Sequence, residues 1–169
     1  MSIIENHPFD ELKLGDSASL VRTLHEKDIQ LFAVMSGDVN PAHVDEEYAK
    51  SDMFHKVIAH GMWSGTLIST VLGTLLPGPG TIYLSQSLSF LHPVGLDDTV
   101  TVTVKVKELY RENCRVKLDC HVVNQRHELV VTGIAEVIAP TEKISRLRVE
   151  LPEVDLRATP NSISLQVIQ

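Results

Sequence analysis

An aspartate and a histidine five positions apart, Asp38 and His43, are the residues whose types and spacing point most directly to chemistry. Gly37 precedes the aspartate, and Asn40 and Pro41 lie between the two. Since Gly37 can end a helix and Pro41 stiffens the segment after it, we predict a rigid non-helical connection that aims both side chains at one point. A carboxylate and an imidazole that meet at one water can deprotonate it or return its proton, which is general acid–base catalysis. An ordinary turn uses the same residue types and is the alternative.

The hydrophobic pattern predicts the elements that would position this pair. Thr23 and Glu26 have the spacing of a capping box, so we expect a helix that begins at Thr23 and ends before Gly37. From Ile82 onward apolar and polar residues alternate, as in half-buried antiparallel strands. The expected elements are a strand at 17–23, this helix, a short helix from about 45, a long helix from about 61, and strands near 82–90, 100–107, 116–122 and 129–138. This order predicts an α+β fold and not a βαβ repeat.

Two motifs carry a resemblance to a known family. The sequence SGDxNPxHxD at residues 36–45 and the sequence AHGM at residues 59–62 resemble those of the MaoC-like (R)-specific enoyl-CoA hydratases. The resemblance covers the chain from about Phe9 to Pro140. It implies a hot-dog fold, in which a curved antiparallel sheet wraps around one long central helix.

The resemblance also implies the roles of the site residues. Asp38 and His43 match the pair that activates the water in this family. The main-chain N–H at Gly61, where the central helix should start, matches the group that holds the thioester oxygen. Ser69 matches a serine that hydrogen-bonds near the catalytic pair, and Asn40 belongs to the same substrate-binding set. A hydroxyl bonded to its own helix backbone is the alternative for Ser69.

Small residues recur every fourth position on the expected central helix, at Gly65, Ser69 and Gly73. They give one smooth face, which admits either a thin ligand or a closely packed sheet; sheet packing is the commoner use of such a face. Leu72 should follow Gly65 and Ser69 on the same side, so we expect it to limit the length of the acyl chain. Packing beneath the sheet is the alternative for Leu72.

Other patterns bear on metals and nucleophiles. His60 directly precedes the expected helix start, so we expect it to orient that turn by hydrogen bonding, with a direct catalytic role as the alternative. His55 and His60 lack the His-Glu-x-x-His spacing of a zinc helix, and we expect no metal. No serine has a G-x-S-x-G setting, which disfavours a nucleophilic triad. The implied reaction consumes no cofactor, since coenzyme A enters as part of the substrate.

Composition narrows the class of protein. A chain of 169 residues suits one domain with a real core. A net charge of −7 without a basic run argues against nucleic acid as a partner. The most apolar stretch, residues 62–76, is too short to span a bilayer, and the N-terminus has no signal-peptide pattern. Cys114 and Cys120 are too far apart along one expected strand to pair, so they indicate reduced thiols in a cytoplasmic protein.

We therefore predict a hot-dog hydratase domain at 1–140 and a C-terminal extension or linker at 141–169, where Pro152 and Pro160 interrupt a weakly periodic sequence. The family implies an acyl-CoA thioester as substrate and a homodimer or higher homo-oligomer with sheets joined edge to edge. The extension could lead to a fused or partner acyl-CoA enzyme, or pack on the body. The alternative functions are a hot-dog thioesterase, a dehydratase of carrier-protein thioesters, and an inactive acyl-CoA-binding module.

Overall fold

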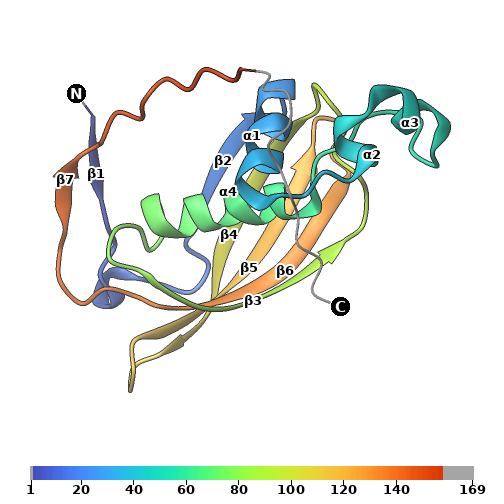
Figure 1. The fold of residues 1–169 in the computed structure, drawn as a ribbon. Coiled ribbons are helices and arrows are strands. Elements are labelled where there is room, and N and C mark those ends of the chain that lie inside the picture. The colour runs from blue at the N-terminus through green and yellow to red at the C-terminus, as the bar shows by residue number, and fades with distance from the viewer. Residues whose placement is uncertain (1, 158–169) are drawn as a thin grey trace, which may run out of the picture.

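The computed structural model describes residues 2–157, and its central feature is a curved antiparallel sheet around one long helix (Figure 1). In chain order the elements are β1 (Ile3–Glu5), the 3-10 helix η1 (Phe9–Glu11), β2 (Ser17–Thr23), α1 (Glu26–Ser36), α2 (Pro41–Val44), α3 (Glu46–Ser51), α4 (Gly61–Thr74), β3 (Ile82–Phe90), β4 (Thr99–Tyr110), β5 (Arg115–Asn124), β6 (Leu129–Ile138) and β7 (Ser145–Leu147). Five strands form the main sheet in the order β2-β4-β5-β6-β3. This is the predicted α+β arrangement.

The core lies between α4 and the sheet. Val100, Val102 and Val104 of β4 are completely buried, whereas the threonines between them are only partly so. The period of two that the sequence shows therefore marks the face that packs on the helix. On α4 the buried residues include Ile68 and Val71, so the helix presents an aliphatic face to the strands. Within residues 2–157 no helix has both the length and the apolar character needed to cross a membrane.

Helix α1 ends as predicted but begins later than expected. Gly37 has a left-handed φ of 76°, and its N–H donates to the Ala33 carbonyl at 2.8 Å, which closes the helix. At the other end His25, not Thr23, is the N-cap, and the His25 N–H donates to the Asp28 carboxylate at 2.9 Å. The expected start was wrong because Thr23 is still the last residue of β2, where its hydroxyl pairs with a threonine on β4.

The glycines of α4 do not form one uniform face. A Cβ at Gly61 would lie 3.2 Å from the Phe90 ring, and one at Gly65 would lie 3.3 Å from Leu88, so β3 packs closely on the first two turns. A Cβ at Gly73 would meet nothing within 4 Å. Close packing of the sheet, the alternative raised for these small residues, therefore explains Gly65 and does not explain Gly73.

The beginning of the C-terminal extension packs on the body of the domain. Strand β7 pairs antiparallel with β1, and the two lie apart from the main sheet (Figure 1). The completely buried Asn6 donates to the Glu142 carbonyl and accepts from the Ile144 N–H, both at 2.8 Å. Residues 158–169 of the predicted extension lie outside the described residues.

Leu72 gives a test of the core. Its side chain is 1% exposed among the residues between α4 and the sheet. We expect Leu72→Ala to lower the free energy of unfolding by about 2–5 kcal/mol, since the lost contacts leave a cavity. Urea unfolding measures this, with Leu151→Ala as control because Leu151 is 88% exposed. Equal effects of the two substitutions would contradict the assignment of Leu72 to the core.

Candidate functional site

Asp38, His43 and His60 come together from three segments. Asp38 follows the end of α1, His43 lies in α2, and His60 directly precedes α4. One polar atom from each lies within 4.8 Å of the others. The structure thus brings Asp38 and His43 together, as the sequence predicts, and adds a second imidazole.

The connection between the pair is non-helical at residues 37–40, as predicted, but becomes helical at Pro41, contrary to prediction. Pro41 is the first residue of the one-turn helix α2, and the Asn40 carboxamide oxygen caps it by accepting from the Ala42 N–H at 3.2 Å. Proline suits this position because its fixed φ fits a helix and its missing N–H would have no helical partner. The rigidity expected from Pro41 stays a prediction, and the helical form of the segment from Pro41 onward was not predicted.

The hydrogen bond of His43 sets which of its nitrogens is available. His43 Nδ1 lies 2.8 Å from the Ile58 carbonyl oxygen. A carbonyl can only accept, so Nδ1 carries the proton and Nε2 keeps a lone pair. His43 therefore presents a hydrogen-bond acceptor, as a base or water-holding group requires.

Asp38 is exposed, and its carboxylate accepts from the Asn40 N–H at 3.1 Å. Asn40 therefore supports the site twice, by holding the carboxylate and by capping the helix of His43. Its placement in the substrate-binding set stays a prediction.

His60 is fixed more tightly than either of these residues. It is 2% exposed, and its ring stacks on Phe32 with centroids 4.7 Å apart and lies 4.1 Å from the ring of His43. Its Nε2 donates to the main-chain carbonyl of Asp38 at 3.0 Å. In the described part of the chain its buried Nδ1 has no hydrogen-bond partner, which typically costs about 1–3 kcal/mol.

Two cavities meet at His43. One, of about 260 Å³, is lined by His43, His60 and Gly61 together with apolar side chains such as Phe54 and Phe90. Gly61 is the first residue of α4, so its N–H belongs to the unpaired, positive end of the helix. The other cavity, of about 400 Å³, lies on α1, α2 and α3 and carries charges of both signs.

The remaining predicted residues lie elsewhere. Ser69 is exposed on α4, and Leu72 belongs to the core; neither lines the two cavities at His43 in the described structure. Leu72 was expected to lie with Ser69 on one ligand-facing side, but Leu72 is in the core whereas Ser69 is exposed. A step of three residues leaves the two side chains about 60° apart around the helix, and the edge of the buried face falls between them. Ser64, which the sequence reasoning passed over, is 2% exposed and lines the smaller cavity. Ser64 comes three residues after Gly61, and this spacing, which places two residues on one side of a helix, could have indicated that both line one cavity.

Two imidazoles and one carboxylate are also donor types that a transition metal accepts. A metal here would take up the same lone pairs that acid–base catalysis needs. The expectation of no metal stays a prediction.

Comparisons with known proteins agree with this geometry. A family model described as "MaoC like domain" matches residues 13–129. An (R)-specific enoyl-CoA hydratase of Rhodospirillum rubrum is 50% identical over 136 residues, which are 79% of this chain and 92% of the relative. A 3-hydroxybutyryl-CoA dehydratase of Methylorubrum extorquens is 41% identical over 135 residues, which are 80% of this chain and 85% of the relative.

A solved structure is similar over almost the whole chain. The unliganded R-hydratase PhaJ1 of Pseudomonas aeruginosa matches with a TM-score of 0.88 and 46% identity, covering 92% of this chain and 99% of its own. The curved five-stranded sheet around α4 is therefore the hot-dog fold.

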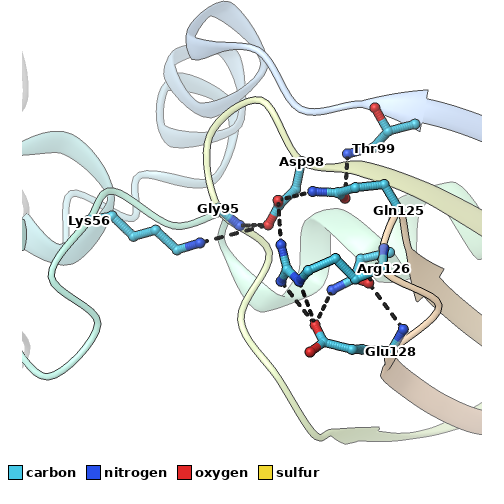
Figure 2. A network of polar contacts seen from close by, with 8 residues as sticks. Lys56, Gly95, Asp98, Thr99, Gln125, Arg126 and Glu128 are labelled. Carbon is cyan, nitrogen blue, oxygen red and sulfur yellow. Dashed lines mark hydrogen bonds and ion pairs between the residues drawn. The ribbon is translucent and has the colours of Figure 1, made fainter.

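A network of polar contacts around Asp98 joins the segments that carry Lys56, Gly95 and Gln125 (Figure 2). The Asp98 side chain is 8% exposed and accepts from the Gly95 N–H at 2.8 Å and from the Gln125 carboxamide at 2.5 Å. Lys56 and Arg126 lie 3.9 and 3.6 Å from its carboxylate. Burial alone would raise the pKa of Asp98, but these hydrogen bonds and positive charges outweigh it and lower that pKa below its ordinary value.

This lowered pKa gives a test of stability against pH. The carboxylate stabilises the fold above the pKa of an unfolded aspartate, about 3.9, and this contribution is lost as the pH falls through the lower folded pKa. We expect Asp98→Asn to reduce the free energy of unfolding at pH 7 by about 1.5–3 kcal/mol, and the difference to shrink below about pH 4. Urea unfolding across this range measures it.

Asp97→Asn is the matched control, since the neighbouring Asp97 side chain is 81% exposed. A pH-independent difference between wild type and Asp98→Asn, or an equal loss in the control, would contradict the role of the Asp98 charge.

Proposed function

This chain belongs to the MaoC-like family, and we propose that it uses Asp38 and His43 to add water reversibly to trans-2-enoyl-CoA, giving (R)-3-hydroxyacyl-CoA. The observation that carries the proposal is that His43, which lies beside Asp38, lines one cavity together with the start of α4. Two of its relatives are an enoyl-CoA hydratase and a hydroxybutyryl-CoA dehydratase, which name the two directions of one reversible reaction. The activity is that of a hydro-lyase.

In the proposed mechanism Asp38 and His43 hold one water. As the water oxygen bonds to C3 of the substrate, its proton passes to this pair, and the π electrons of the double bond move toward the thioester carbonyl. The pair then returns a proton to C2 on the same face. The Nδ1–H of His43 already donates to the Ile58 carbonyl, so Nε2 is the nitrogen that faces the water.

The enolate needs a place for its negative charge. The Gly61 N–H at the start of α4 offers a hydrogen-bond donor together with the positive end of a helix dipole. Because Gly61 has no Cβ, a thioester can approach its backbone closely. The Phe90 ring bounds the space over Gly61 and would flank the reacting carbons.

We propose that coenzyme A is part of the substrate and that no separate cofactor or metal takes part. The free thiols of Cys114 and Cys120 support the proposal of a reducing, cytoplasmic setting.

We propose a homodimer for a separate reason. Strand β3 is an edge of the main sheet, and its side chains Ile82, Leu84 and Phe90 are 56%, 42% and 52% exposed. A long apolar edge strand is usually covered or paired. A second copy beside β3 would cover these side chains and border the cavity at Phe90.

Catalysis is tested with Asp38→Asn and His43→Ala. The first keeps the shape and removes the base, and we expect each to lower kcat for crotonyl-CoA hydration by about 10²–10⁴-fold in a folded protein. The double variant should be little slower than either single one, because both residues act on one water. Loss of the enoyl thioester's ultraviolet absorbance measures the rate, and multiplication of the two single losses would show that the residues act independently.

The same assay distinguishes the alternatives. Release of free thiol identifies a thioesterase, and binding without either signal identifies an inactive binding module. Prior treatment with EDTA should leave the rate unchanged, and a chelator-sensitive rate would refute the metal-free mechanism.

The dimer is tested with Leu84→Glu, which places a charge on the apolar edge. We expect sedimentation equilibrium to give a dimer for the wild type and a monomer for this variant. Leu151→Glu is the control, because Leu151 is exposed on the extension. A wild-type monomer, or a dimer unaffected by Leu84→Glu, would contradict pairing along β3.

A further inference from the structure

We propose that His60 is a positioning residue that fixes the base Asp38 relative to the oxyanion donor Gly61. The inference rests on the proposed hydratase function and adds to it a residue that need not touch the substrate. His60 acts here through the hydrogen bond of its ring to Asp38 and through its place in the chain next to Gly61.

One residue connects both halves of the site. The His60 side chain donates to the Asp38 carbonyl, while its own carbonyl accepts from the Trp63 N–H at 2.9 Å and so forms the first turn of α4. The base and the helix start are therefore linked through a single buried residue. The position of Asp38 is therefore coupled to that of the start of α4 through this hydrogen bond.

The other hydrogen bonds of Asp38 join it to residues two positions away in the sequence. Its N–H donates to the Ser36 hydroxyl at 3.2 Å, and its carboxylate accepts from the Asn40 N–H, and both contacts are exposed. Among the described residues, the contact with His60 is the hydrogen bond that connects Asp38 to a segment 22 residues away. Without it, the turn after α1 would be held only by neighbours that move with it.

The chemistry of the ring shows what the histidine contributes. Because Nε2 donates to a carbonyl, a neutral His60 carries a bare lone pair on Nδ1, and that atom is buried without a partner in the described part of the chain. A phenyl ring would fill the same stack on Phe32 without this unsatisfied atom. The feature that a phenyl ring could not replace is the Nε2–H donor to Asp38.

Two amide variants of His60 distinguish the effect of losing the hydrogen-bond donor from the effect of losing the volume of the ring. His60→Gln places an amide nitrogen as many bonds from Cβ as Nε2 is, whereas the amide nitrogen of His60→Asn is one bond shorter and cannot reach Asp38. We expect kcat for crotonyl-CoA hydration to fall by roughly 10²-fold in His60→Asn, with a smaller change in KM, because the base is displaced. His60→Gln should retain about tenfold more activity than His60→Asn. Equal kcat values for the two would overturn the proposal.

His60→Phe separates positioning from stability. It keeps the aromatic stack, removes the donor and removes the unpaired Nδ1. We therefore expect a kcat loss like that of His60→Asn together with a melting temperature at or above that of the wild type. A wild-type kcat in a folded His60→Phe protein, or losses of kcat that simply follow losses of melting temperature across the three variants, would overturn the proposal.

A double variant and a structure complete the test. If His60 works through Asp38, Asp38→Asn with His60→Phe should be no slower than Asp38→Asn alone. A slower double variant would overturn the proposal. If the wild type itself fails to hydrate crotonyl-CoA, the proposed function fails, and a crystal structure of His60→Phe then decides the positioning role: an Asp38 turn in its wild-type place refutes it, and a displaced turn supports it.

Discussion

Burial of α4 in the concave face of the sheet is the constraint on which the site depends. The helix is aliphatic on the side that meets β4, so its axis is fixed by core packing and not by the loops around it. Its first residue, Gly61, is thereby held at the rim of the sheet, where the positive end of the helix faces a cavity. The proposed oxyanion site is thus a consequence of where an apolar helix must lie.

The two imidazoles of the site are held differently, by main-chain carbonyls. His43 and His60 each donate one ring N–H to a carbonyl, of Ile58 and Asp38 respectively. In both rings this leaves the other nitrogen as an acceptor, so the backbone determines the chemical character of each imidazole. Asp38 itself stays exposed, which leaves its carboxylate open to water.

The sequence predicted the structure best where a single local feature, such as alternation or a glycine, determines an element. Alternation predicted β3 to the residue, and Gly37 marked the end of α1. Local rules failed where they competed, as at Thr23, which could cap a helix but pairs with β4 instead. The surroundings of Leu72 were predicted wrongly, because helical spacing tells on which side of a helix a residue lies but not whether a sheet or a cavity lies against that side. The pairing of β7 with β1 and the contact of His60 with Asp38 could not be predicted, since each joins segments far apart in the chain.

The Asp98 network is connected to the site through the main chain. Asp98 accepts from the Gly95 N–H (Figure 2). Gly95 in turn forms a β-bridge with Ile58, and the Ile58 carbonyl accepts from His43. The absence of a Cβ at Gly95 is what lets Lys56 pass over it toward Asp98, since a Cβ there would lie 2.5 Å from the lysine nitrogen. An ion network centred on the buried Asp98 is thus connected through the backbone to the imidazole of His43. The orientation of His43 is therefore set by the same interactions that stabilise this end of the sheet.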